Sequence, residues 1–437
     1  MKPTGLLVAV AVLALLGGAV WWSNKKQAAA AKSPTDTTVK LLTIPDDQFQ
    51  EIRIKKAGAD EEDLKRQDGK WQLTAPKALP ADQDTAVSLV TSLSNVTADA
   101  VIEPKATDLK PYGLANPSLD VQVQLKNGKT DELQVGDDTP TGSGSYAKLA
   151  GDPRVVTIGT YVKSSLDKSP NDLRDKRLLT FDSDKLTRVL LDAKGQTIEF
   201  GKSGQSEWQI LKPRPLRADS SAVSSLVDKL KDAKMDLTAT GDPAKEFAAA
   251  TKVATATVTD ASGNQTLEVR KDKDKNVYAK SSVVEGIYKV NADLADAVDK
   301  SLDDFRNKKL FDFGFSDPSK VEVNTAVYTK SGDKWMAGPK AMDNTSVQNL
   351  IDKLRDLSAS KFADAGAGDP VFTATVTSND SKRVEKVTIR KQGDKYFAQR
   401  ENEPSIYELD AQAVTDLQKA ASDVKEAPPP AAPAKKK

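Results

Sequence analysis

Three tryptophans, each followed by a proline and a cation, are the residues whose types and spacing could do chemistry in this sequence. The pairs are Trp71 and Lys77, Trp208 and Arg214, and Trp335 and Lys340. An indole face can stack on a sugar ring and a cation can pair with an anion, so the set could line a groove for a glycan or an anionic ligand. The competing interpretation, which we favour, places the tryptophans in the core and leaves the cations solvated.

Composition excludes several other chemistries. The 437 residues include no Cys and no His. Zinc sites built on thiolate or imidazole, Ser-His-Asp and Cys-His nucleophiles and redox dithiols are therefore excluded. The formal net charge of +1 lacks the basic excess of a nucleic-acid binder, so we expect no nucleic-acid partner.

No cofactor and no metal site is predicted. The carboxylate pairs Asp182-Ser183-Asp184 and Asp272-Lys273-Asp274 lack the glycine and the closing glutamate of a Ca²⁺ loop. Other carboxylates could form a hydrolase pair, but no local pattern selects two of them. The sequence therefore predicts a protein that is not an enzyme, with a carboxylate-based hydrolase as the less favoured alternative.

Each tryptophan lies before a helical pattern that begins at an aspartate: Asp82, Asp219 or Asp343. Apolar residues follow at four, seven, eight and eleven positions after each aspartate, which is one face of an α-helix capped by the carboxylate. The three helices are expected to run through Leu93, Leu230 and Leu354. Internal repetition of this kind is typical of a tandem array.

Alternating apolar residues before and after each helix predict antiparallel strands, clearest around the Asn127-Gly128 turn. The predicted fold class is α+β: three tandem repeats, each a mostly antiparallel sheet with packed helices, after one N-terminal transmembrane helix. We expect the repeat units at residues 40–182, 183–318 and 319–425.

The N-terminal residues 5–22 form an uncharged apolar run that would reach roughly 27 Å as a helix, close to the thickness of a bilayer. We expect a transmembrane anchor here, with the lipid bilayer as partner; a cleaved signal peptide is the alternative. Residues 23–39 are expected to be a flexible tether and 426–437 a disordered Pro/Ala/Lys tail. More lysines follow the run than precede it, so charge alone leaves the orientation open.

A second motif recurs between the units. Residues 173–181, from Leu173 to Phe181, correspond to residues 305–313, from Phe305 to Phe313. Because the motif occurs where another unit follows, we interpret it as a clasp between neighbours, with Phe181 and Phe313 buried at the joints.

The Trp-to-helix repeat, the string Tyr112-Gly113-Leu114-Ala115-Asn116-Pro117 and the junction Leu173-Arg174-Asp175-Lys176 together resemble one known group. It is the bacterial domain-of-unknown-function family of membrane-anchored repeat proteins encoded beside gliding-motility-type ABC transporters. The second and third units lack the Tyr112–Pro117 string. The resemblance implies a single inner-membrane span, an exported domain and association with a transporter, and it brings no catalytic residues.

The functional expectation is therefore a membrane-tethered, extracytoplasmic, non-enzymatic accessory or scaffold of an ABC transporter complex, with permease subunits as partners. We expect single-pass attachment to the bacterial inner membrane and a periplasmic bulk. The alternative is a cell-envelope glycan-binding protein that uses the tryptophans and cations.

Overall fold

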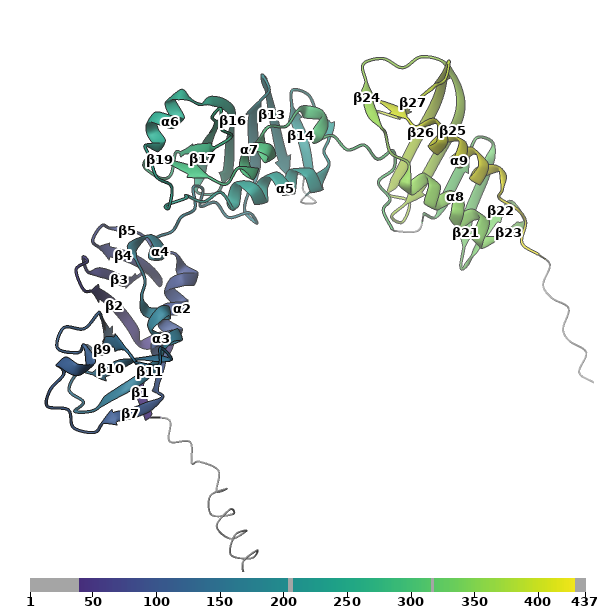
Figure 1. Cartoon of the computed structure of the whole chain (residues 1–437). Helices are drawn as coiled ribbons and strands as arrows, with labels where there is room; N and C mark the ends of the chain where they lie inside the picture. The colour runs from purple at the N-terminus through teal and green to yellow at the C-terminus, as the bar shows by residue number, and fades with distance from the viewer. Residues whose placement is uncertain (1–38, 203–206, 316–317, 429–437) are drawn as a thin grey trace, which may run out of the picture. The chain divides into compact units, whose positions relative to one another are not determined.

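The structure is a computed structural model that describes residues 39–202, 207–315 and 318–428. Strands make up 44% of it and helices 21%, and the strands form four sheets. The chain divides into two compact units, with Lys176 the last residue of the first and Arg177 the first residue of the second (Figure 1).

The predicted fold class, α+β with a leading transmembrane helix, is wrong. The structure is mostly antiparallel β-sheet, and in the part of the chain that it describes no helix is long and apolar enough to cross a membrane. The predicted anchor at 5–22 lies outside the described residues. A capped amphipathic helix gives a strong local signal, whereas a strand such as Glu62–Gln67, with one apolar residue, shows no alternation, so the sequence pattern favours helices over strands.

The predicted internal repetition is supported, because the three large sheets share one strand order. Their orders are β5-β4-β3-β2-β8-β9-β10-β11-β7, β15-β14-β13-β12-β16-β17-β18-β19 and β23-β22-β21-β20-β25-β26-β27-β28-β24. We call the residues around them the first repeat (39–176), the second repeat (177–308) and the third repeat (309–428). Among the residues that the structure describes, the second sheet has no counterpart of the last edge strand that β7 and β24 supply to the others.

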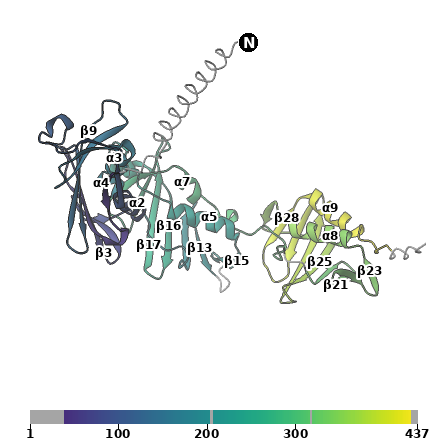
Figure 2. The ribbon, with the colours of Figure 1, turned by 90° about the horizontal axis from the view of Figure 1, so that it is seen from below.

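The elements of the first repeat are β1 (Val39–Thr43), η1 (Asp46–Gln48), β2 (Phe49–Lys56), β3 (Glu62–Gln67), β4 (Lys70–Ala75), β5 (Leu79–Pro80), α2 (Gln83–Ser94), β6 (Asn95–Ala98), β7 (Ala100–Glu103), η2 (Lys110–Tyr112), β8 (Leu119–Leu125), β9 (Thr130–Asp138), β10 (Gly144–Leu149), β11 (Val155–Gly159), α3 (Thr160–Leu166) and α4 (Pro170–Leu173). Strands β1 and β6 form the separate two-stranded sheet. Helices α2, α3 and α4 lie together beside the large sheet (Figure 2).

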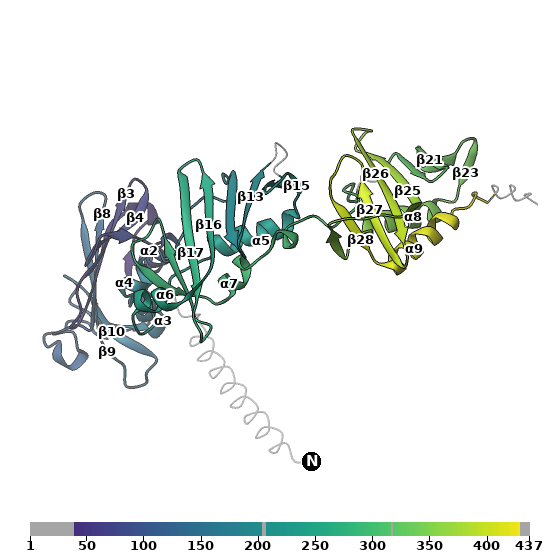
Figure 3. The ribbon, with the colours of Figure 1, turned by 90° about the horizontal axis from the view of Figure 1, so that it is seen from above.

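The elements of the second repeat are β12 (Arg188–Ala193), β13 (Gln196–Lys202), β14 (Trp208–Lys212), β15 (Leu216–Arg217), α5 (Ser220–Lys231), α6 (Pro243–Ala249), β16 (Thr251–Asp260), β17 (Gly263–Lys271), β18 (Val277–Ser281), β19 (Ile287–Val290), α7 (Asp293–Val298) and η3 (Leu302–Asp304). Those of the third are β20 (Lys320–Val323), β21 (Ala326–Ser331), β22 (Lys334–Ala337), β23 (Lys340–Met342), α8 (Asn344–Asp356), β24 (Lys361–Ala363), β25 (Asp369–Ser378), β26 (Arg383–Gln392), β27 (Lys395–Arg400), β28 (Ile406–Leu409) and α9 (Ala411–Ser422). Helices α8 and α9 pack side by side against the third sheet (Figure 3).

The central strand of each sheet has one buried face and one polar face. On β8, Leu119, Val121 and Val123 are buried and alternate with half-buried polar residues such as Gln122. Strands β16 and β25 alternate in the same way, with threonines on the polar face. The buried face meets the helices, so each repeat has its own core on one side of its sheet.

The predicted capped helices are confirmed as α2, α5 and α8. Asp82, Asp219 and Asp343 are their N-caps, and each side chain accepts a hydrogen bond from a backbone N–H of the first turn. The buried residues of each helix are the four predicted from the spacing. Sequence periodicity therefore fixes which helix face packs on the sheet.

We expect Leu230→Ala to destabilise the second repeat by about 2–5 kcal/mol, because it leaves a cavity beneath α5. Leu230 is fully buried, whereas Ser225 on the same helix is exposed. Urea denaturation should show the loss for Leu230→Ala and none for the control Ser225→Ala. Equal stability of the two variants would contradict this packing.

Candidate functional site

The three tryptophans lie in the cores of their repeats. Trp71, Trp208 and Trp335 are 4%, 6% and 4% exposed. Each tryptophan is also bonded to its helix, because its backbone N–H donates to the side chain of the first helical residue: Gln83 at 2.9 Å, Ser220 at 3.3 Å and Asn344 at 3.2 Å. The indole faces are therefore not open for stacking on a sugar, and their role here is packing.

The cations that follow the tryptophans do not converge on them. Lys77, Arg214 and Lys340 are exposed, and Lys340 forms an ion pair with Glu426. Lys202 does lie over an indole, 5.3 Å from the Trp208 ring centroid. The structure thus buries the predicted aromatic rings and leaves the predicted cations exposed.

The Tyr112–Pro117 string also has a structural explanation. The Tyr112 hydroxyl donates to Glu103 at 2.9 Å, and Leu114 is buried. Gly113 has φ of 68°, and a Cβ there would lie 2.5 Å from the Asp137 side chain. The string therefore closes a tight loop against β9, which requires glycine.

The four residues named for the junction motif all lie in hydrophobic cores of the repeats. Leu173 belongs to the core of the first repeat and Phe305 to that of the second, where its ring lies 4.9 Å from Phe200. Phe181 and Phe313 belong to the cores of the repeats that follow them. Both phenylalanines are buried, and the chain passes from one hydrophobic core directly into the next; a clasp between neighbouring units stays a prediction.

The first residues of the expected tail at 426–437 make backbone bonds, while residues 429–437 lie outside the described residues. The N–H of Asp343 donates to the Lys425 carbonyl at 2.9 Å, and the N–H of Ala427 donates to the Ala341 carbonyl at 2.9 Å. The segment after α9 therefore pairs with the edge of the third sheet, as the junction motifs do in the other repeats.

Arg217 on β15 connects the second and third repeats, which both belong to the second compact unit. Its guanidinium donates to Asp312 at 2.6 Å, to the Lys309 carbonyl at 2.9 Å and to the Tyr407 hydroxyl at 3.2 Å. The side chain is only 19% exposed. Charge-assisted hydrogen bonds with little solvent access are stronger than those of exposed pairs.

Carboxylates complete this network. Glu403 lies 3.6 Å from the Arg217 Nε and accepts hydrogen bonds from Arg400 Nε at 2.7 Å and the Tyr407 hydroxyl at 2.8 Å. Burial, with the Glu403 charge, raises the pKa of Tyr407 to about 12, so the phenol stays a donor at neutral pH. No local sequence pattern marks these residues, because the partners are far apart in the chain.

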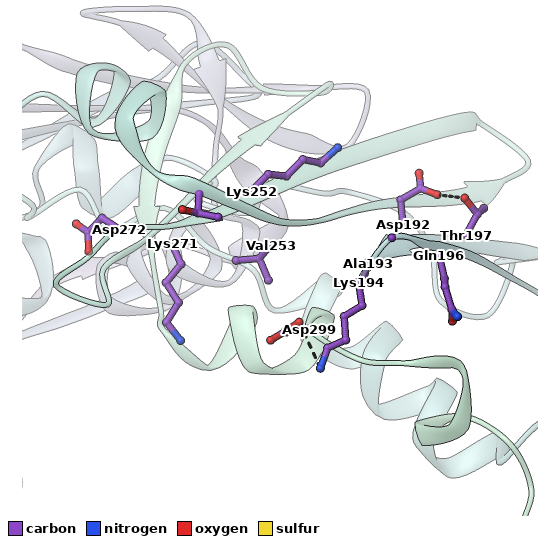
Figure 4. A pocket seen from close by; sticks show the side chains of 12 residues that line it. Asp192, Ala193, Lys194, Gln196, Thr197, Lys252, Val253, Lys271, Asp272 and Asp299 are labelled. Carbon is purple, nitrogen blue, oxygen red and sulfur yellow. Dashed lines mark hydrogen bonds and ion pairs between the residues drawn. The ribbon is translucent and has the colours of Figure 1, made fainter. Parts of the chain in front are cut away.

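A second polar arrangement surrounds a cavity of about 710 Å³ in the second repeat. It lies at the β12–β13 turn, the start of β16, the end of β17 and the residue after α7 (Figure 4). Lys194 and Gly195 form the two-residue turn, both with positive φ. The charged residues that line the cavity are Asp192, Lys194, Lys252, Lys271, Asp272 and Asp299.

The corresponding place in the first repeat holds a buried acid. Lys56, at the end of β2, pairs with Asp167 after α3 at 2.6 Å. Nearby Glu62 is 2% exposed. Burial raises the pKa of Glu62 to about 7, against the opposing effect of Lys56 and with a further increase from Asp167.

Within the described residues, no group of three or more Asp or Glu is arranged to hold a metal ion. The predicted pairs serve local bonds: Asp182 pairs with Lys185, and Asp272 accepts from Asn276.

Comparison with protein families finds two matches to one family, described as "Domain of unknown function (DUF4340)", at residues 71–214 and 208–371. A comparison with curated proteins found no match. Each family match starts at the tryptophan strand of one repeat and ends in the next repeat, so it includes a junction motif.

We expect Arg217→Gln to loosen the second and third repeats from each other, because Asp312 and Glu403 lose a buried cationic partner. The expected cost is about 1.5–3 kcal/mol in the unfolding free energy of this unit, with faster tryptic cleavage after Lys308 and Lys309. The control is Arg214→Gln, which removes an exposed cation of the same β14–β15 loop. The network would be unimportant if both variants behaved like the native chain.

We expect Glu62→Gln to change how stability depends on pH. Since burial raises the folded-state pKa of Glu62 to about 7, above its ordinary value of 4.5, native stability falls as pH rises from about 4.5 through 7 and then levels off. Glutamine cannot ionise, so the variant should not lose this stability. Between pH 5 and pH 8 its unfolding free energy should rise by about 1–3 kcal/mol relative to that of the native chain. Denaturation at both pH values measures it; Glu61→Gln, at an exposed position, should leave the pH profile unchanged.

Proposed function

We propose that this chain, which belongs to the DUF4340 family of domains of unknown function, is a non-enzymatic scaffold of an ABC transporter complex. The proposal places the repeats outside the cytoplasm in a bacterial envelope. It also takes the lipid bilayer as the partner of residues 5–22, because that sequence is apolar and uncharged.

The observation that carries the scaffold role is the repeated sheet with one face left to solvent. In each repeat the helices pack on one face, and the other face of the central strand carries polar, half-buried side chains. A broad polar surface suits contact with another protein better than binding of a substrate for catalysis.

Two further features support this role. The Arg217 network connects the second and third repeats, so their faces belong to one compact unit. The resemblance carried by Tyr112–Pro117 and Leu173–Lys176 supports a transporter as the partner. The buried tryptophans disfavour the glycan-binding alternative, since they have no open ring face.

Photo-crosslinking in native cells tests the proposal. A photoreactive residue at Gln122, Thr257 or Thr375 lies on the polar sheet faces, and one at Val87 or Ser225 lies on an exposed helix surface. We expect crosslinks from the sheet positions to an integral permease subunit, identified by mass spectrometry, and few from the helix positions. Recovery of no transporter subunit from any sheet position would refute the scaffold role.

A further inference from the structure

Glu62 occupies a core position of the first repeat that holds an apolar residue in the other two. It lies opposite Ile54, where β2 and β3 pair. At the same place of the sheet order, the second repeat has Ile198 and the third has Ala326. Ile198 is fully buried in its core, and Ala326 packs against its own. The fold therefore does not require an acid here, so the acid has another role.

The Glu62 carboxyl is buried with one oxygen atom unpaired. The residue is 2% exposed, and its Oε2 atom is buried with no hydrogen-bond partner among the described residues. An ionised carboxylate in such a place costs more free energy than a protonated one, because it has lost its hydration and this atom has gained no donor. The closed fold of the first repeat therefore favours the neutral acid.

One cation and three carboxylates surround Glu62. Lys56 lies on the same face of β2, diagonally opposite and within reach of a long side chain, but its ammonium pairs with Asp167 at 2.6 Å. Burial raises the pKa of Glu62 to about 7; the charge of Lys56 opposes this effect and the nearby carboxylates add to it. These carboxylates are Asp60 in the β2–β3 turn, Asp167 after α3 and Asp172 in α4.

Two of these carboxylates belong to the segment 160–173, which contains α3 and α4. The ion pair of Lys56 with Asp167 connects the end of α3 to β2. Helix α3 has 7 residues and α4 has 4, so neither is stable alone and both rely on contacts with α2 or the sheet (Figure 2). The segment is therefore the part of the first repeat that a charge on Glu62 disturbs most directly.

We propose that Glu62, Lys56 and Asp167 form a proton-dependent latch that holds the segment 160–173 on the rest of the first repeat. While Glu62 is protonated, Lys56 stays paired with Asp167 and the segment is closed. When Glu62 loses its proton to water, its carboxylate repels Asp167 and attracts Lys56. The ion pair then weakens, and the segment opens so that water hydrates the new charge. The latch does not depend on the scaffold role.

Hydrogen–deuterium exchange of the full chain at pH 5.5 and pH 8.5 tests the latch, read as protection factors that correct for the intrinsic effect of pH on exchange. Opening exposes Glu62, so its pKa returns from about 7 to its ordinary value of 4.5. Protection of the segment 160–173 should therefore be roughly 10- to 30-fold lower at pH 8.5 than at pH 5.5. Protection of β8 and β9, at the centre of the sheet, should change less than about twofold.

Two variants at the acid and one beside it isolate its charge. Glu62→Gln and Glu62→Ile, the second copying Ile198, should protect the segment 160–173 equally at both pH values. Glu61→Gln, at an exposed position, should keep the native response. The comparison also separates Glu62 from Asp120, whose pKa burial raises to about 6 and which alternates with buried residues on β8.

Asp167→Asn tests the ion pair. It should lower protection of the segment 160–173 roughly two- to fivefold at pH 5.5, as for the loss of one partly exposed pair. Circular dichroism ensures that each variant is folded. The latch would be overturned by native protection in Asp167→Asn, by a pH response that survives in Glu62→Gln and Glu62→Ile, or by an equal loss of protection in β8 and β9.

Discussion

Each repeat depends on the bonds made at its capping aspartate. The carboxylate of Asp82, Asp219 or Asp343 caps a helix, while its backbone N–H donates to a carbonyl near the end of the repeat: Leu173 at 2.7 Å, Phe305 at 2.8 Å and Lys425 at 2.9 Å. Each capping aspartate is thus bonded both to the first turn of its helix and to the segment at the end of its repeat. This one residue type positions three segments that are distant in sequence, which explains why it stands at the same place in every copy.

The entry into a repeat is held by two chemically different clamps. In the second repeat Ser281 donates to the Leu178 carbonyl, and Gln265 accepts from the Thr180 N–H. In the third repeat Arg400 and Glu385 make the corresponding bonds to Leu310 and Asp312, and they pair with each other at 3.1 Å. Neutral groups suffice for the backbone bonds, so the ionic pair has a further role.

That role follows from Arg217. The Arg217 guanidinium is partly buried, so its charge must be balanced by nearby carboxylates. These carboxylates also form ion pairs with Arg400. A buried charge left without a partner is costly, so such groups occur as a network or not at all. The third repeat therefore has charged clamp residues because it also contacts the second.

The sequence predicted what is local and missed what is not. The capped helices, their buried faces and the buried tryptophans follow from spacing alone, because helix periodicity repeats within a dozen residues. The strand content was underestimated, since charged strands such as β3 show no alternation. The Arg217 network and the cavity could not be predicted, because both bring together residues from separate strands and turns whose meeting depends on the tertiary fold.

The passage of the chain from core to core limits where it can be divided. Leu173 completes one hydrophobic core, and Leu178 already belongs to the next; Phe305 and Leu310 repeat this relation. A boundary between two repeats leaves both cores complete only if it falls among the few polar residues between Leu173 and Leu178 or between Phe305 and Leu310. A gene duplication that began or ended elsewhere would have produced a module with part of its core missing, so ancestral copying events had a narrow window in which to succeed.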